Sequence, residues 1–377
     1  MNPRQGLLEL YATGLAAVNG TSVVYRALLA RAERNPCHVV AIGKAADAML
    51  DGARRYLHHA LRSALLITKH GHVAAHTATL DNVQIFEAAH PVPDESSLAA
   101  GQALLDYLQA LPADEPVLFL ISGGTSSLVE VLADGWVLEG LQALTNELLA
   151  NGADIHEINV MRRSVSRIKG GQLWDYLGER AVTCLLMSDV PNDDPEVIGS
   201  GLLFPAPSAR DFDWQMVANN AAMLEAMAAS ELFAPTTIMP EFLVGDVLTA
   251  ASTCVQHLLD SEPGIYLWGA ETTVQLPEQP GRGGRNQHFA LAAALQLQDA
   301  DDCLLLVAGT DGTDGMTADA GALVDSGTCL RGNAENLDPV ACLHAADAGT
   351  FLEASGDLIH VGVTGTNVMD VVIGLKL

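Results

Sequence analysis

The sequence predicts an α/β protein with a doubly wound, mostly parallel sheet, and two observations favour this class. Short apolar runs typical of buried strands alternate with helical patterns of about 10–15 residues, as in βαβ units. Most of these runs end in a loop rich in Gly, Ser or Asp, where open α/β sheets place their binding sites. The 377 residues are enough for two domains with full cores.

The first part of the chain contains strand-like runs that each lead into a polar or glycine-rich loop. They cover residues 38–42, 64–68, 83–87, 116–121 and 181–187. Residues 202–214 are proline-rich and irregular, and an Ala- and Met-rich pattern predicts a helix over 216–232. We therefore expect a Rossmann-like α/β domain over residues 1–232.

The second part of the chain, residues 233–377, predicts a smaller α/β domain. Helices are expected over 245–259, 287–297 and 338–355, the last of which can also be read as two short helices; strands are expected over 264–269, 303–308 and near 358–363. No internal repeat is evident.

The charge balance restricts the partners of this protein. Lys plus Arg is 19 and Asp plus Glu is 46, which gives a formal net charge of −27 and argues against nucleic acid or an anionic membrane as partner. The six cysteines form no C-x-x-C pair, which is typical of reduced core thiols. With no signal-peptide pattern and no run of 18 apolar residues, we expect a cytoplasmic protein.

Two loops combine glycine with groups that bind anions. Gly43-Lys44-Ala45 lies where a strand turns into a helix, and a lysine there is disfavoured by the helix dipole unless it neutralises an anion. Residues 122–127, S-G-G-T-S-S, follow a buried strand and open a helix, so that their N–H and hydroxyl groups can hold phosphate. The alternatives are a surface lysine and an ordinary helix cap.

A glycine-flanked arginine precedes the helix expected over 287–297. Arg285 follows glycines at 281, 283 and 284, and its planar fork can clamp phosphate or carboxylate. The alternative is an ion pair with an acid such as Asp311 or Asp314. Aspartates also follow the strand over 181–187 and could hold Mg²⁺, act as a general base or simply cap turns.

Other charged residues are less informative. Arg162, Arg163, Arg167 and Lys169 concentrate positive charge over residues 162–169, and the alternative is a solvated helix face. His70, His72 and His76 do not have the spacing of a standard zinc site.

Taken in order, these motifs resemble the glycerate 2-kinase family, whose C-terminal part is called the MOFRL domain. The matching segments span roughly residues 40 to 370: A-I-G-K-A-A, T-K-H-G-H, H-P-V-P-D-E, I-S-G-G-T-S-S-L, I-N-x-x-R-R-S-V-S-R-I-K-G-G, S-D-V-P-N-D-D-P-E-V-I-G-S-G, E-T-T-V, G-R-G-G-R-N-Q-x-F-A-L, A-G-T-D-G-T-D-G and T-G-T-N-V-M-D. The chain departs from the family pattern at residues 201–204, at Ser164 and at Gly269-Ala270.

The resemblance implies an enzyme that phosphorylates D-glycerate at C2 with ATP and Mg²⁺ in a cleft between its two domains. Lys44 and Arg285 are implied as catalytic cations. The implied substrate- and nucleotide-binding residues are Lys69, Ser122, Gly123, Gly124, Ser126, Arg162, Glu271, Asn286 and Asn367. The implied metal ligands are Asp189, Asp194, Asp311 and Asp314. The sequence does not decide whether the protein forms a homo-oligomer.

Two other functions stay open. A hydroxypyruvate reductase would need a G-x-G-x-x-G fingerprint with an acidic residue about 20 positions on, which A-I-G-K-A-A and I-S-G-G-T-S-S lack. A hydroxy-acid-binding relative with weakened catalysis is suggested by the departures from the family pattern.

Overall fold

The chain forms two compact units, each assembled from separate segments. The computed structural model describes residues 2–32, 35–150, 155–208, 210–230, 232 and 235–377. The parallel-sheet unit comprises Val18–Asn219 and Gly365–Val368, and the mixed-sheet unit comprises Met1–Ala17, Asn220–Thr364 and Met369–Leu377. The domain boundary expected between residues 232 and 233 falls among residues 231, 233 and 234, which lie outside the described residues.

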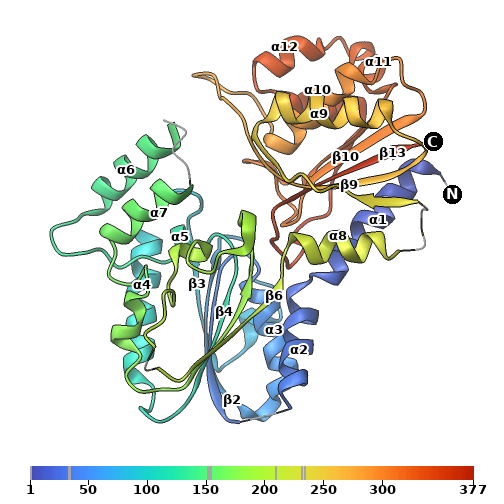
Figure 1. Ribbon diagram of the computed structural model, residues 1–377. Helices are drawn as coiled ribbons and strands as arrows, with labels where there is room; N and C mark the ends of the chain where they lie inside the picture. The colour runs from blue at the N-terminus through green and yellow to red at the C-terminus, as the bar shows by residue number, and fades with distance from the viewer. Residues whose placement is uncertain (1, 33–34, 151–154, 209, 231, 233–234) are drawn as a thin grey trace. The chain divides into compact units, whose positions relative to one another are not determined.

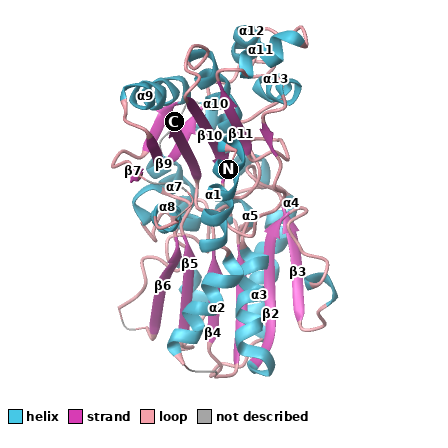
Figure 2. Ribbon diagram, turned by 90° about the vertical axis from the view of Figure 1, so that its right-hand side faces the viewer, coloured by secondary structure: helices cyan, strands magenta, loops and turns pink. Residues whose placement is uncertain are grey.

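In the described part of the parallel-sheet unit, six parallel strands form one sheet in the order β3-β2-β1-β4-β5-β6 (Figure 2). The strands are β1 (Cys37–Ile42), β2 (Leu61–Lys69), β3 (Val83–Ala88), β4 (Val117–Ile121), β5 (Val182–Met187) and β6 (Phe212–Ala218). This confirms the predicted α/β class, and the order is that of a Rossmann fold. The order reverses between β1 and β4, so the crevice beyond the carboxyl ends of these two strands is the expected binding place.

Helices cover both faces of this sheet (Figure 1). The α-helices are α2 (Gly20–Arg31), α3 (Ala46–Leu57), α4 (Glu95–Ala110), α5 (Thr125–Leu128), α6 (Leu138–Ala150) and α7 (Ile155–Ser164). Short 3₁₀ turns cover η1 (His58–Ala60), η2 (Thr77–Thr79), η3 (Gln172–Tyr176), η4 (Pro191–Asp193) and η5 (Ile198–Ser200). Every residue of β1 and β4 is buried, which is why these strands read as unbroken apolar runs.

The sixth strand corrects the sequence prediction. Residues 202–214 were expected to be irregular and 216–232 helical, whereas Phe212–Ala218 is β6 and the helix is α8 (Asn220–Ala228). β6 lies at the edge of the sheet, pairs only with β5 over the described residues and carries exposed Asp213, Trp214 and Gln215. Edge strands lack the continuous apolar run of a central strand.

The mixed-sheet unit contains parallel and antiparallel pairs in the order β12-β11-β10-β13-β9-β7, with β8 beside β9. Its strands are β7 (Thr236–Ile238), β8 (Leu243–Asp246), β9 (Gly264–Thr273), β10 (Cys303–Gly309), β11 (Gly321–Asp325), β12 (Leu358–Ile359) and β13 (Asp370–Lys376). Its helices are α1 (Pro3–Ala17), α8, α9 (Val247–Asp260), α10 (Arg285–Gln296), α11 (Thr328–Ala334), α12 (Pro339–His344) and α13 (Ala348–Ser355).

Predictions for this unit were partly correct. The strands expected over 264–269 and 303–308 are present as β9 and β10, and residues 338–355 form two short helices. The strand expected near 358–363 is only Leu358–Ile359, and the long C-terminal strand is β13. β13 lies between β9 and β10 and is antiparallel to both. Residues 370–376 therefore form a central strand of this sheet.

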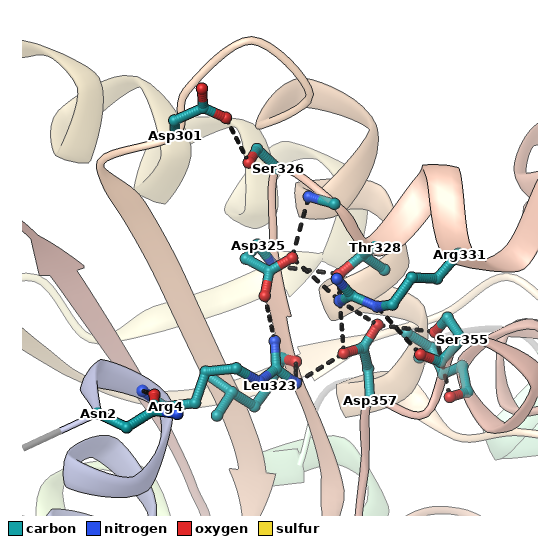
Figure 3. Close-up of polar contacts among 12 residues, drawn as sticks. Asn2, Arg4, Asp301, Leu323, Asp325, Ser326, Thr328, Arg331, Ser355 and Asp357 are labelled. Atoms are coloured by element: carbon teal, nitrogen blue, oxygen red, sulfur yellow. Dashed lines mark hydrogen bonds and ion pairs between the residues drawn. The ribbon is translucent and has the colours of Figure 1, made fainter.

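The N-terminal helix α1 belongs to the mixed-sheet unit, and a charged network attaches it there (Figure 3). The Arg4 guanidinium donates to the Leu323 carbonyl at 2.8 Å and to Asp357 Oδ1 at 2.6 Å, and it also pairs with Asp325. Arg331 pairs with the same two carboxylates, at 2.7 Å to Asp357 Oδ1 and 3.0 Å to Asp325 Oδ1. The Asp357 side chain is only 1% exposed, so two arginines together neutralise a buried charge.

Helices α1 and α2 together, Pro3–Arg31, are long and apolar enough to cross a membrane by length and composition alone. The core helices of a folded domain have the same composition, and Leu7, Leu10 and Tyr11 are at most 1% exposed here. Asn19 interrupts the segment by accepting a hydrogen bond from Thr21 N at the start of α2. The segment is therefore weak evidence for a membrane span.

Candidate functional site

The loops after β1 and β4 are joined at the point where the strand order reverses. Lys44 N donates to the Gly123 carbonyl at 2.9 Å, and Ala45 N donates to Ser122 Oγ at 3.1 Å. Gly43 has φ +127°, and a Cβ on it would collide with Ser122, so glycine is required for this close approach. The two motifs selected from the sequence thus form one structure, with half-buried Lys44 at its centre.

Asp189 and Asn367 lie against this structure from other parts of the chain. A Cβ on Gly123 would collide with Asp189 Oδ2 and Asn367 Nδ2, so both side chains reach the backbone of the loop after β4. Asn367 Nδ2 donates to Asp189 Oδ2 at 3.2 Å. The short segment Gly365–Val368 belongs to the parallel-sheet unit and brings Asn367 to this place. The structure therefore gathers Lys44, Ser122, Gly123, Asp189 and Asn367, all predicted site residues.

Two histidines beside Lys44 were absent from the predicted site. Gly124 has φ +85°, and a Cβ on it would lie 3.1 Å from Lys44 Cγ and 3.2 Å from His90 Cδ2. His72 Nδ1 lies 3.3 Å from the Lys44 carbonyl oxygen. Both histidines belong to matched family segments, T-K-H-G-H and H-P-V-P-D-E, and this signal could have identified them.

The remaining predicted binding residues of this unit are Lys69, Arg162, Gly124 and Ser126. Lys69 is the last residue of β2, and Arg162 is in the last turn of α7. Burial lowers the pKa of Arg162, and Glu130 opposes this shift. Ser126 Oγ lies 2.8 Å from Ser200 Oγ, which joins the loop after β4 to η5.

Two cations of the positively charged segment 162–169 form ion pairs with acids of the protein. Lys169 is 1% exposed and pairs with fully buried Glu130. Arg163 pairs with Glu196 at 3.6 Å. Neither adds unpaired positive charge to the site.

The aspartates after β5 are partly committed to local structure. Asp194 Oδ1 accepts a hydrogen bond from Glu196 N at 2.9 Å, and Asp193 accepts one from Asn219. Among the described residues, no three His, Cys, Asp or Glu side chains are grouped so as to hold a metal ion. This includes His70, His72 and His76. Metal binding by Asp189, Asp194, Asp311 and Asp314 stays a prediction.

Arg285 is the first residue of α10 in the mixed-sheet unit. Its Nε donates to Asp370 Oδ2 at 2.6 Å, and its Nη1 and Nη2 each meet one carboxylate oxygen of Glu271, the latter at 3.0 Å. The ion pairs of Arg285 found in the described residues are therefore with Glu271 and Asp370, two acids that the sequence did not single out as its partners. Burial acts to lower the pKa of Arg285, but the two carboxylates outweigh burial and raise it, so the guanidinium stays charged.

The N-terminus of α10 is occupied by a carboxylate of the protein itself. Asp314 Oδ1 accepts from Asn286 N at 3.1 Å, and its Oδ2 accepts from Gln287 N at 2.8 Å. A Cβ on Gly284 would collide with Asp314, and one on Gly281 would collide with Asp347. The space left by these glycines is therefore filled by aspartate side chains of the protein itself. Burial raises the pKa of Asp314 to about 7 against these hydrogen bonds.

Asp311 and Asn286 are buried in the same unit, 7% and 2% exposed. Asp311 Oδ1 accepts a hydrogen bond from Thr313 N at 2.9 Å.

Tyr11 of α1 donates its hydroxyl to the Gly309 carbonyl at 2.7 Å. Burial raises the pKa of Tyr11, and so do the charges of Asp311 and Asp370, so Tyr11 stays a neutral hydrogen-bond donor.

Most departures from the family pattern lie in the core. Leu202, Leu203 and Phe204 are at most 7% exposed, and Trp174 Nε1 donates to the Leu203 carbonyl at 3.0 Å. Ala270 lies within the buried part of β9. Ser164 is exposed, and its Oγ donates to the Met161 carbonyl of its own helix at 2.7 Å.

Two known families cover most of the chain. Residues 6–231 match a family described as a domain of unknown function (DUF4147), and residues 264–370 match the MOFRL family. D-glycerate 2-kinase of Thermotoga maritima is 33% identical over 89% of this chain and 90% of its own. Glycerate 2-kinase of Pyrococcus horikoshii is 30% identical over 90% and 87%.

Further comparisons agree on the fold but carry two functional names. A protein of Agrobacterium vitis, provisionally named a hydroxypyruvate reductase, is 32% identical over 98% of this chain and 94% of its own. The crystal structure of glycerate kinase from Thermotoga maritima superimposes with a TM-score of 0.85 at 31% identity, over 99% of each chain. Sequence and fold together show that the chain belongs to the glycerate 2-kinase family of enzymes, with a MOFRL region in its C-terminal part.

Proposed function

We propose that the protein phosphorylates D-glycerate at C2 with ATP, giving 2-phosphoglycerate and ADP. One observation carries the proposal: Lys44 lies where the strand order reverses, next to the Gly123-Gly124 backbone, Asp189 and Asn367. A cation beside a glycine-rich turn at this point of an α/β sheet suits a phosphate ligand. The names of the Thermotoga and Pyrococcus relatives support glycerate as the acceptor.

The chemistry needs positioning and positive charge more than covalent catalysis. The C2 hydroxyl oxygen of glycerate attacks the γ-phosphorus, the bond from phosphorus to the ADP oxygen breaks, and the hydroxyl proton is released. Lys44 would neutralise charge on the transferred phosphoryl oxygens. Arg285 would act on the same substrates, which requires residues of both units in one reaction at an inter-domain site.

Magnesium fits the donor chemistry of the parallel-sheet unit. Asp189 supplies a hard carboxylate oxygen next to Gly123 and Asn367, and Mg²⁺ is usually held by one or two carboxylates together with substrate phosphates. When bound, Mg²⁺ would neutralise phosphate charge. We propose Asp189 as its first protein ligand, with Asp194 and Asp311 as further candidates. Asp314, whose two oxygens cap α10, is the weakest of the predicted ligands.

A hydroxypyruvate reductase is the second candidate, because the strand order is also that of dinucleotide-binding sheets. The turn after β1 reads Gly43-Lys44-Ala45-Ala46. It lacks the second and third glycines that let a dinucleotide pyrophosphate approach the backbone and the helix pack closely. The kinase is therefore favoured.

Two assays on the purified chain separate these functions. With ATP, Mg²⁺ and D-glycerate we expect ADP release, and the coupling of ³¹P to the C2 proton in the product should place the phosphate at C2. With NADH and hydroxypyruvate we expect no oxidation of NADH. Phosphate at C3, or reduction without ADP release, would refute the proposal. Calorimetric binding of glycerate without turnover would indicate the weakened relative.

We further propose that the enzyme acts in the cytoplasm on small molecules, without nucleic acid or membrane as partner. The formal net charge of −27 and six free, buried cysteines support this. Cell fractionation with recovery in the membrane pellet, or salt-dependent retention of the protein on DNA, would contradict it.

A further inference from the structure

We infer that Glu130 is a positioning residue for the reaction: through Lys169 it fixes the loop after β4 that carries Ser122, Gly123 and Gly124. This inference rests on the proposed function. Glu130 lies two residues beyond α5 and outside the matched I-S-G-G-T-S-S-L segment, and it has no expected contact with a substrate.

The Glu130–Lys169 pair is fully enclosed by protein. The side chains are 0% and 1% exposed, and Lys169 Nζ meets Glu130 Oε2 in an ion pair. The same ammonium donates to the Ser126 carbonyl at 2.7 Å. A buried ammonium needs such partners because its desolvation is costly. The Ser126 carbonyl is therefore held by a cation whose own position depends on Glu130.

Glu130 is itself held in one orientation. Its backbone N donates to the Ser97 carbonyl at 3.1 Å, and its Oε1 accepts from Val131 N at 3.0 Å. A Cβ on Gly101 would collide with the Glu130 carbonyl, which shows how closely α4 packs on this segment. With Oε1 bound to the backbone, Oε2 is directed at Lys169.

The fixed carbonyl controls the loop that adjoins Lys44. Ser127 Oγ donates to the Gly124 carbonyl at 3.1 Å, and Thr125 Oγ1 donates to the Ser122 carbonyl at 2.7 Å. These bonds make residues 122–127 one compact turn, so a shift at Ser126 also moves Gly123, which bonds to Lys44 N. A misplacement of about 1 Å away from the chemistry can lower a rate by up to 10²-fold.

The charges around Lys169 give this arrangement a pH signature. Burial lowers the pKa of Lys169, Arg162 of α7 lowers it further, and Glu130 opposes both. Within the described residues, these two are the charged groups that act on Lys169. Replacing Glu130 with a neutral residue leaves burial and Arg162 unopposed, so Lys169 should lose its proton at a lower pH than in the wild type.

The first test is Glu130→Gln, assayed for glycerate phosphorylation from pH 6 to 9. We expect kcat to fall about tenfold or more at the alkaline end and to recover as the pH is lowered and Lys169 regains its proton. Glu130→Asp, which keeps the carboxylate, should restore part of the rate. A Glu130→Gln enzyme with the wild-type kcat and pH profile would overturn the inference.

A double variant keeps the test informative if Glu130→Gln fails to fold. Replacing a buried ion pair with apolar residues of similar volume is often neutral or stabilising, so Glu130→Met/Lys169→Met should fold but leave the Ser126 carbonyl without its donor. We expect a wild-type melting temperature and a reduced kcat. A folded double variant with full kcat would refute the inference.

The wild-type enzyme separates failure of this inference from failure of the proposed function. If the wild type does not phosphorylate glycerate, the proposed function fails, and positioning is then judged by calorimetric binding of ATP and D-glycerate to the wild type and the double variant. Weaker binding by the double variant would support positioning of the loop, and equal binding would refute it.

Discussion

The guanidinium of Arg285 lies edge to edge with the carboxylate of Glu271, so that each terminal nitrogen meets one oxygen. Its Nε is bound to Asp370. A guanidinium has five N–H donors, and the bonds found among the described residues use three of them, so we propose that the other two bind a substrate anion. Arg285 can therefore be both a structural tie and a phosphate clamp, and kinetics must separate the two roles.

Replacing Arg285 with lysine tests the clamp. Lysine keeps one positive charge for Asp370 but cannot reproduce the planar fork. We expect Arg285→Lys to lower kcat on the order of 10²-fold with little change in melting temperature. The control is Asp370→Asn, which weakens the tie at Nε but leaves the guanidinium in place. A lower melting temperature with unchanged turnover in Arg285→Lys would favour the tie and exclude the clamp.

Replacing Lys44 tests the loop between β1 and α3. The backbone bond from Lys44 N to Gly123 does not depend on the side chain, so Lys44→Ala should fold normally. Loss of one preorganised charge should lower kcat on the order of 10²-fold or more. Lys376→Ala is the matched control, because Lys376 pairs with Asp302 at 2.8 Å on β13 and should leave turnover unchanged. Near-wild-type turnover in Lys44→Ala would remove Lys44 from the mechanism.

The buried carboxylate of Asp314 predicts a pH dependence of stability. Burial raises its pKa from 3.8 to about 7, so between these values the folded state holds a proton that the unfolded state lacks. The free energy of unfolding from this group is therefore greatest below about pH 4 and declines as the pH rises through about 7. Asp314→Asn cannot ionise and should reduce this decline. Urea unfolding of the wild type and of Asp314→Asn from pH 5 to 8 measures this decline. If the free energy of unfolding falls equally steeply with pH in both proteins, the raised pKa of Asp314 is contradicted.

The network around Asp357 should contribute to the stability of the mixed-sheet unit. Asp357→Asn removes a buried charge shared by Arg4 and Arg331. Because both arginines are partly exposed and can be rehydrated, we expect a loss of about 1.5–3 kcal/mol. The control is Asp213→Asn, which breaks the exposed pair with Arg31 and should cost about 1 kcal/mol or less. Equal losses in the two variants, measured by chemical unfolding, would rule out the stabilising role.

The parallel sheet could be predicted because its central strands are buried on both faces and read as apolar runs. β6 could not, since an edge strand with exposed Asp213 and Gln215 lacks that pattern. β13 escaped prediction although it is apolar, because nothing in its local sequence shows that the chain returns to pair with both β9 and β10.

Lys44 and Ser122 could be placed together because each directly follows a strand, and the carboxyl ends of neighbouring parallel strands meet. The contact between Asp189 and Asn367 joins residues 178 positions apart. The partner of Arg285 Nε is 85 positions away. In a chain with 46 acidic residues, local sequence does not distinguish Asp370 from Asp311 or Asp314 as the partner.

The assignment of α1 to the mixed-sheet unit has a consequence for synthesis on the ribosome. Helix α1 is synthesised before any of its partners. Arg4 can pair with Asp325 and Asp357, and Tyr11 can donate to Gly309, only after these later residues have been synthesised. Until then, its apolar side chains have no core to enter and are exposed to chaperones or to other nascent chains. A fragment of residues 1–232 would contain α8, which packs against Gly14 of α1, but would lack Asp325, Asp357 and Gly309, the polar partners of Arg4 and Tyr11.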